Sequence, residues 1–343
     1  MTASIAILGS SGYAGGELIR LVDGHPDLVV GYLGGFSSAG RTLGSVHPHL
    51  RGGERVLGVN DPESIPDVDL AFLALPHGAS SGPAMALLER GIPVVDLGSD
   101  FRLDTTQRYL DAYGVDHPFP DELGRWAYGM PELYRSEISN TDRVASPGCY
   151  PTSAILPLAP LLSAGLVESI GIIVDSMSGV SGAGRGVQAG LQFGAVDESA
   201  KAYKVLEHRH QPEMERALDL EAASPVELIF TPHLVPMQRG ILTTIYAQTP
   251  AGTTIDDLVA ALEDAYRGEP FVSLVDGSPE TRWVVGSNRS LISVNLDERT
   301  GTTILICAID NLVKGAAGQA VQAANLMLGF DETAGLPMEG WMP

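Results

Sequence analysis

One cysteine lies where a thiol can act as a nucleophile. Cys149 lies in Ser-Pro-Gly-Cys-Tyr-Pro-Thr (146–152), just before an apolar helical pattern over Ser153–Leu162. At the start of a helix, the exposed backbone amides and the helix dipole lower the pKa of a thiol and favour the thiolate. The alternative for a lone cysteine is a small buried hydrophobe. The position favours a nucleophile at Cys149, whereas Cys307, inside an apolar strand pattern, is expected to be structural.

A thiolate nucleophile needs a partner for proton transfer. His208 and His210 lie one residue apart in Glu-His-Arg-His-Gln-Pro-Glu (207–213), and both imidazoles face one side if the segment is extended. A single histidine is more often structural, and His233 is a rival candidate. Because two histidines occur together here, this segment is favoured over His233 as the source of the proton-transfer group. We predict His210 as the acid/base, because it adjoins the Gln-Pro turn.

A glycine-rich turn follows the first apolar segment. The string Gly-Ser-Ser-Gly-Tyr-Ala-Gly (9–15) separates a strand pattern from a helical one. Glycines at this place allow a tight turn and the close approach of a pyrophosphate to the helix N-terminus. The spacing alone is a weak signal, and a plain strand-to-helix turn is the alternative. We predict nucleotide binding by Gly9, Ser11, Gly12, Tyr13, Ala14 and Gly15.

The end of the second strand pattern indicates which nucleotide binds. NAD-binding proteins usually place an acidic residue here for the ribose hydroxyls, but residues 34–41 contain none. Ser37, Ser38 and Arg41 suit a 2′-phosphate instead, because an arginine pairs bidentately with phosphate oxygens. The alternative is that Arg41 is an ordinary surface residue. We therefore predict NADP(H) rather than NAD as the cofactor.

Further polar residues could bind the cofactor or an anionic substrate. His77 follows an apolar strand pattern, where it would line a cofactor cleft, and Arg102 follows the next one. The Gly/Ser-rich loop from Ser178 to Arg185 could hold phosphate or carboxylate groups, although a flexible connector is the alternative. Arg185 and Arg239 are candidate contacts for a substrate carboxylate.

The composition excludes several classes of protein. The chain has 343 residues, with 21 Lys and Arg against 42 Asp and Glu, a formal net charge of −21. Such a charge argues against nucleic acid or an anionic membrane as a partner. Two cysteines make no disulfide framework, and no metal site is expected. The uncharged stretch 144–167 contains four prolines and two glycines, so we predict a loop and a helix rather than a membrane span, in a cytoplasmic protein.

The hydrophobic patterning predicts an α/β fold of two domains. The first, 1–148, alternates strand and helix patterns, which predicts a Rossmann-type doubly wound parallel sheet. The second, 149–311, is expected to be an α+β catalytic domain with a largely antiparallel sheet. The remainder, 312–343, is expected to be a C-terminal helix that packs back on the first domain. The expected strands are Ser4–Leu8, Leu28–Leu33, Asp69–Leu75, Pro93–Leu97, Val144–Ser146, Ile170–Ser176, Val226–Thr231, Ile241–Gln248, Arg282–Val285, Leu291–Leu296 and Thr302–Asp310.

The motifs taken together resemble those of the N-acetyl-gamma-glutamyl-phosphate reductase family, which is similar to aspartate-semialdehyde dehydrogenase and, more distantly, to glyceraldehyde-3-phosphate dehydrogenase. The resemblance spans nearly the whole chain in order. The motifs that carry it are GSSGYAGGEL (9–18), SPGCYPT (146–152), SGVSGAGR (178–185), HRHQPE (208–213), PHLVPMQRGI (232–241) and KGAAGQAVQ (314–322).

The resemblance implies an NADPH-dependent reduction of N-acetyl-L-glutamyl 5-phosphate to the semialdehyde, through a thioester on Cys149, in arginine biosynthesis. It implies a histidine base within 208–210, phosphate recognition near Arg102, and a small-molecule acyl phosphate as substrate. It also implies a return of 314–322 to the nicotinamide cleft and assembly into a homodimer or homotetramer. Further cofactor contacts are expected from Leu75, Pro76, Gly182, Asn311 and Gly318.

Other functions stay open at this point. The acyl phosphate could be a related one, aminoadipyl phosphate of lysine biosynthesis or aspartyl phosphate. A cysteine acyltransferase or hydrolase would use Cys149 and His210 without a nucleotide. In a non-catalytic NADP-binding regulator, Cys149 would be incidental.

Overall fold

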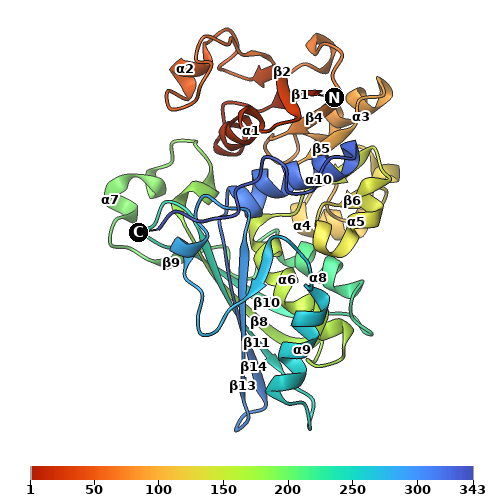
Figure 1. The fold of residues 1–343 in the computed structure, drawn as a ribbon, viewed down its shortest axis with the longest axis vertical. Helices are drawn as coiled ribbons and strands as arrows, with labels where there is room; N and C mark the ends of the chain where they lie inside the picture. The colour runs from red at the N-terminus through yellow and green to blue at the C-terminus, as the bar shows by residue number, and fades with distance from the viewer. Residues whose placement is uncertain (1, 343) are drawn as a thin grey trace. The chain divides into compact units, whose positions relative to one another are not determined.

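The computed structural model describes residues 2–342, and the chain divides into two compact units (Figure 1). One unit contains the residues up to Gly148 together with Ala316–Leu336. The other contains Cys149–Gly315 together with the residues from Pro337 onward. The expectation that all of 312–343 packs on the first domain is therefore wrong for 312–315 and for the end of the chain, which belong to the second unit. There the Asn288 amide donates to the Pro337 carbonyl at 2.8 Å, and the Trp341 amide to the Val285 carbonyl at 2.8 Å.

The first unit is built on a seven-stranded parallel sheet of order β3-β2-β1-β4-β5-β7-β6. The strand order reverses between β1 and β4, and in such sheets ligands bind at the carboxyl edge beside that reversal. The elements are β1 (Ala3–Leu8), α1 (Tyr13–Asp23), β2 (Leu28–Gly35), α2 (Leu43–Val46), β3 (Gly58–Val59), β4 (Leu70–Leu73), α3 (Ser81–Glu89), β5 (Val94–Asp96), α4 (Thr106–Tyr113), β6 (Ala127–Tyr128), α5 (Pro131–Ser139), β7 (Arg143–Ala145) and α10 (Gly318–Leu328).

Helices cover both faces of this sheet, which explains the continuous apolar strands. All four residues of β4 are buried, as expected of a parallel strand covered on both sides. On one face Leu8 and Leu73 pack with Leu87 of α3. On the other, α10 contacts α1, α5 and β5. A helical run from the end of the chain thus completes the doubly wound layer.

The second unit contains a mixed seven-stranded sheet of order β12-β13-β14-β11-β8-β10-β9. Most neighbouring strands run antiparallel; β8–β10 and β12–β13 are the parallel pairs. The helices α6, α8 and α9 lie against one face of the sheet (Figure 1). The elements are α6 (Cys149–Ser163), β8 (Ile170–Ser178), α7 (Phe193–Val196), β9 (Lys201–Ala202), α8 (Gln211–Asp219), β10 (Glu227–Leu234), β11 (Ile241–Gln248), α9 (Ile255–Ala265), β12 (Val272–Leu274), β13 (Ser290–Asp297) and β14 (Thr302–Ile309).

These two sheets confirm the predicted fold class, with one strand misassigned. The expected strand Arg282–Val285 is instead a 3₁₀ turn, Thr281–Trp283. Its apolar side chains pack over the sheet rather than in it, because Val284 and Trp283 join a small core with Leu291 of β13. Within residues 2–342 no helix combines the length and the apolar content that crossing a bilayer requires.

Candidate functional site

Helix α6 places Cys149 at its first position, the end where the backbone amides are exposed. Its first turn is fixed to the sheet by hydroxyls. The Ser153 Oγ lies 2.7 Å from the Thr243 Oγ1 of β11, which lies 2.8 Å from the Ser176 Oγ of β8. Pro160, inside the helix, has no amide to donate to the Leu156 carbonyl, and the Tyr266 hydroxyl donates to that carbonyl instead.

Two tyrosines and two histidines gather around the start of α6. The Tyr150 and Tyr203 hydroxyls lie 2.9 Å apart. The Tyr150 ring lies 5.5 Å from the His208 ring and 5.9 Å from the His210 ring, between centroids. Burial raises the pKa of Tyr203 to about 12, and the charge of the Cys149 thiolate contributes to the rise. Burial also raises the pKa of Tyr150 above its ordinary range, so both phenols stay protonated near pH 7.

The histidine pair lies in a turn, so the expectation of an extended segment is wrong. His210 is the residue before α8 and has helical backbone angles, φ −82° and ψ −16°. The two imidazole centroids are nevertheless 4.8 Å apart. The His210 amide donates to the His208 Nδ1 at 3.2 Å, which makes that nitrogen an acceptor. Burial, with the positive charges of Arg209 and Lys204, lowers the pKa of His208 to about 4, so His208 is neutral near pH 7.

The two cysteines differ in their burial. Cys307 is fully buried in β14, 3.3 Å from the Ser290 Oγ, and burial raises the pKa of its thiol to about 12. Cys149 is partly exposed. Gly315 lies against it, because a Cβ on Gly315 would come within 2.7 Å of the Cys149 Cβ. A side chain at position 315 would therefore displace Cys149.

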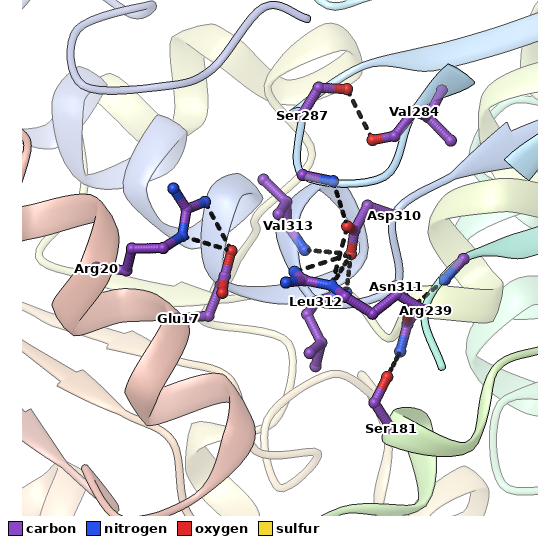
Figure 2. A network of polar contacts seen from close by, with 12 residues as sticks. Glu17, Arg20, Ser181, Arg239, Val284, Ser287, Asp310, Asn311, Leu312 and Val313 are labelled. Atoms are coloured by element: carbon purple, nitrogen blue, oxygen red, sulfur yellow. Dashed lines mark hydrogen bonds and ion pairs between the residues drawn. The ribbon is translucent and has the colours of Figure 1, made fainter. Parts of the chain in front are cut away.

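Figure 2 shows a polar network at the end of β14. The Arg239 Nε lies 3.1 Å from the Asp310 Oδ2, and its Nη2 donates to the Asp310 Oδ1 at 3.2 Å. Asn311 accepts from the Gly240 amide at 2.8 Å and donates to the Ser181 Oγ at 2.9 Å. The predicted residues Arg239 and Asn311 therefore lie in one network with the 178–185 loop. Of that loop, Ser178 is buried, and Gly182 and Arg185 are exposed.

The glycine turn of the first unit has the geometry of a phosphate cradle. Gly9 has φ +77°, and a Cβ there would lie 2.2 Å from the Ala74 carbonyl oxygen. A Cβ on Gly15 would lie 2.3 Å from the Gly9 carbonyl oxygen. Gly12 precedes α1 without a side-chain cap, so the first amides of α1 are open to an anion. The Gly9 amide donates to the Asn60 Oδ1 at 3.0 Å, which fixes the turn.

The end of β2 fits a phosphorylated ribose. Ser38 is buried, and its Oγ has no hydrogen-bond partner among residues 2–342. Ser37 and Arg41 are exposed, and the Arg41 Nη2 donates to the Ser45 carbonyl at 3.1 Å. A hydroxyl without a partner and a surface guanidinium beside a glycine turn are groups that a 2′-phosphate can use. The residues of this unit therefore fit a dinucleotide.

A buried carboxylate organises the sheet edge that carries His77 and Arg102. Asp100 accepts from the Gly78 amide at 2.7 Å and the Ser81 amide at 3.0 Å, and the His77 Nδ1 lies 3.2 Å away. Burial opposes the charge of Asp100, but these hydrogen bonds outweigh it and hold its pKa below the usual range. Arg102 is buried and donates to the Leu97 carbonyl at 2.8 Å.

The predicted residues fall into two groups. The first unit carries the glycine turn, Ser37, Ser38, Arg41, Arg102, Gly318 and the 75–77 segment, in which Leu75 is buried and Pro76 exposed. The second carries Cys149, both histidines, the 178–185 loop, Arg239 and Asn311. No group of three or more His, Cys, Asp or Glu side chains within residues 2–342 is arranged to hold a metal ion.

Sequence reasoning missed several residues of these groups. Tyr150 is adjacent to the cysteine and could have been noticed. Glu213, fully buried in the first turn of α8, follows His210 by three residues, the spacing of one helix face. Gly315 lies in the quoted motif 314–322, but its contact with Cys149 was not predicted. Tyr203 and Asp310 carry no local signal, because only the tertiary fold brings them to Tyr150 and to Arg239.

Both units match models of known families. Residues 4–141 match the semialdehyde dehydrogenase NAD-binding domain, and residues 149–311 match the semialdehyde dehydrogenase dimerisation domain. Among solved structures, aspartate semialdehyde dehydrogenase II of Vibrio cholerae, complexed with ASA, superposes with a TM-score of 0.71 at 19% identity, covering 96% of this chain and 99% of that one. The NADP complex of the Candida albicans enzyme has a TM-score of 0.72 at 14% identity, with the same coverage.

Curated relatives extend over the whole chain. The N-acetyl-gamma-glutamyl-phosphate reductase of Pelotomaculum thermopropionicum is 44% identical, covering 100% of both chains. That of Symbiobacterium thermophilum is 46% identical, covering 98% of both. These matches confirm the resemblance carried by the motifs. The chain is an oxidoreductase and belongs to the N-acetyl-gamma-glutamyl-phosphate reductase family.

Proposed function

We propose that the chain reduces N-acetyl-L-glutamyl 5-phosphate to N-acetyl-L-glutamate 5-semialdehyde with NADPH, in arginine biosynthesis. The observation that carries the proposal is Cys149 at the first position of α6, where the next residue, Tyr150, packs against the His208–His210 pair and is hydrogen-bonded to Tyr203. That arrangement combines a nucleophile, a proton-transfer group and hydrogen-bond donors. It is suited to acyl transfer through a thioester.

The first half-reaction needs only this chain's residues. The Cys149 thiolate attacks the acyl carbon, a carbon–sulfur bond forms, and the bond to the phosphate oxygen breaks, so inorganic phosphate leaves. The product is a thioester, which accepts a hydride far more readily than a carboxylate does. Among the predicted anion contacts, Arg102, Ser178, Arg185 and Arg239 are proposed to bind the phosphate and the substrate carboxylate.

The second half-reaction is the reduction. The glycine turn and the end of β2 are the residues that would hold NADPH, and the bound cofactor would supply the hydride for the thioester carbon. The thiohemiacetal oxyanion that results needs donors, and the Cys149 amide at the helix start is suited to this. His210 is proposed to protonate that oxygen and to assist collapse of the thiohemiacetal, which releases the semialdehyde and restores the thiolate.

The reverse reaction tests the proposed function directly. We expect N-acetylglutamate semialdehyde, NADP and phosphate to give NADPH, measured by absorbance, and aspartate semialdehyde to react far more slowly. A preference for aspartate semialdehyde, or for an aminoadipate-derived aldehyde, would assign the chain to a different acyl phosphate. Turnover without any nucleotide would instead indicate an acyltransferase or a hydrolase.

Cofactor preference gives a second test. We expect Arg41→Ala to weaken NADPH binding about 10- to 100-fold and to leave NADH binding nearly unchanged, because a charge-assisted hydrogen bond to the 2′-phosphate is worth about 1.5–3 kcal/mol. Titration of protein fluorescence with each nucleotide measures both affinities. Equal weakening of both would show that Arg41 acts on the fold or on the shared pyrophosphate.

We propose further that the chain forms a homo-oligomer, a dimer or tetramer, through the sheet face of the second unit that α6, α8 and α9 do not cover. Apolar side chains form a row across this open face, since Ile229, Ile173, Tyr246 and Ile304 are register partners on four adjacent strands. Ile173, Ile229 and Tyr246 are 38–49% exposed. Exposed apolar area of this kind marks an interaction surface. The match of residues 149–311 to a dimerisation domain supports an interface in this unit.

A charge in the middle of this row tests the assembly. We expect Ile173→Asp to raise the dimer dissociation constant about 100-fold or more, because an unpaired buried charge costs several kcal/mol. Sedimentation velocity over a range of concentrations measures it. Val187→Asp, on a residue 92% exposed outside the sheet, is the matched control and should leave the mass unchanged. A dimer unaffected by Ile173→Asp would place the interface elsewhere.

The proposed location is the cytoplasm. Neither Cys149 nor Cys307 forms a disulfide, and a catalytic thiol stays reduced in that compartment.

A further inference from the structure

Asp310, which follows β14, is a buried carboxylate with an unusually complete set of partners. Its side chain is fully buried. The Oδ1 accepts from the Leu312 amide at 2.8 Å and the Val313 amide at 3.2 Å, and the Oδ2 from the Gly286 amide at 2.7 Å. The Nε and Nη2 of Arg239 complete the set (Figure 2). Three amides hold the carboxylate in place, and the carboxylate holds one edge of the guanidinium.

The same residue also reaches the nucleophile through its main chain. The Gly315 amide donates to the Asp310 carbonyl at 2.9 Å, and Gly315 packs directly against Cys149. Asp310 thus contacts Arg239 by its side chain and the wall behind Cys149 by its backbone. The position of the guanidinium relative to the sulfur depends on this one residue.

The side chain of the neighbouring Asn311 binds two segments, the backbone next to Arg239 and the 178–185 loop. Its amide group binds the Gly240 amide, next to Arg239, and the Ser181 hydroxyl of the 178–185 loop. Arg239 is therefore held at its backbone by Asn311 and at its guanidinium by Asp310. An arginine held at both ends loses little further conformational freedom when it binds an anion.

We propose that Asp310 is a positioning residue of the reaction, acting through Arg239. It directs the guanidinium toward the substrate carboxylate and sets the distance from that carboxylate to the Cys149 sulfur. The inference rests on the proposed function, because it takes N-acetylglutamate semialdehyde to be the product. A two-point carboxylate–guanidinium contact fixes the plane of the guanidinium as well as its location, so the direction depends on the carboxylate and not on charge alone.

The test compares two aldehydes in the reverse reaction with NADP and phosphate. N-acetylglutamate semialdehyde carries the carboxylate, and 4-acetamidobutanal is the same molecule without it. We expect Asp310→Asn to raise KM for the first about 10-fold or more, the effect of losing a charge-assisted contact, with kcat nearly unchanged. KM for 4-acetamidobutanal should not change. Asp297→Asn is the matched control, because Asp297 also pairs with an arginine, Arg299. Asp297 lies at the end of the β13–β14 pair that is remote from Asp310. Its substitution should change neither KM.

A double-mutant cycle shows whether Asp310 acts through Arg239. If it does, Asp310→Asn adds nothing to the KM of Arg239→Ala, measured with N-acetylglutamate semialdehyde. Additive effects, or equal losses with both aldehydes, would overturn the proposal and leave Asp310 a structural residue. A wild-type enzyme that does not oxidise N-acetylglutamate semialdehyde would overturn the proposed function instead.

Arg239→Lys keeps the test decisive if Asp310→Asn does not fold. Lysine retains the charge but cannot make the two-point contact with Asp310. We expect its KM for N-acetylglutamate semialdehyde to match that of Arg239→Ala within about threefold. A KM equal to that of the wild type would show that charge alone suffices, and the positioning role would be overturned.

Discussion

Cys149→Ser reduces turnover to less than about a hundredth of the wild type and leaves NADPH binding nearly intact; this is the largest effect that we expect. The helix start stabilises a thiolate, but a serine hydroxyl stays protonated there and cannot attack the acyl carbon as an anion. Steady-state assay of the reverse reaction measures turnover, and fluorescence titration measures NADPH affinity. Turnover above a hundredth would remove Cys149 from the nucleophile's role.

Cys307→Ser is the matched control for this substitution. The new hydroxyl would be fully buried in β14, where a polar group costs about 1–3 kcal/mol unless it is hydrogen-bonded. The Ser290 Oγ, now 3.3 Å from the sulfur, offers a partner. We expect a lower melting temperature with turnover near that of the wild type. If the folded variant is inactive, the roles of the two cysteines are reversed.

His210→Asn lowers kcat by about 10²–10⁴, the range for loss of a general acid or base. Asparagine fills a similar space in the buried position before α8 but cannot transfer a proton. The pH–rate profile of the variant should lose one limb. A profile with both limbs intact would exclude His210, and His233 would become the leading candidate if His208→Asn also keeps both limbs.

His208→Asn is the comparison, and the lowered pKa of His208 predicts its effect on the pH–rate profile. Because that pKa is about 4, His208 is neutral throughout pH 5–9, so no limb of the profile in that range belongs to it. We expect the profile of His208→Asn to keep its shape. Its KM should rise, since the ring packs against Tyr150 and its Nδ1 accepts from the His210 amide. A limb that disappears in this variant would reverse the two assignments.

Local pattern predicted most of the first sheet correctly, because buried parallel strands are continuous apolar runs. The region 100–142 was different. It contains α4 and α5, yet only Tyr109 is buried in α4, so no helical face of apolar residues could be recognised. Strands of two residues, such as β3 and β6, are equally invisible, since their pairing partners lie far away in the sequence. The parallel pairing of β8 with β10 is set by tertiary contacts alone.

In the site, too, local sequence patterns could be recognised, whereas contacts made by the tertiary fold could not. Cys149 was found from a proline-glycine turn before a helical pattern, which is local information. The turn at 208–210 was expected to be extended, because Pro212 disfavours a helix at the residue before it; the structure tolerates Pro212 in the first turn of α8. Asp310 and Tyr203 reach Arg239 and Tyr150 across more than fifty residues of chain. Contacts of that kind have no signature in the sequence of either partner.

The unequal burial of the two sulfurs has a practical consequence for counting active sites. With its pKa near 12 and no exposure, Cys307 is inert toward alkylating reagents at neutral pH. Only the thiol at the start of α6 remains to react with iodoacetamide. Incorporation of one label per chain, followed by intact-mass spectrometry, therefore reports the fraction of competent enzyme in any preparation. No engineered tag and no change of sequence is required for such a titration.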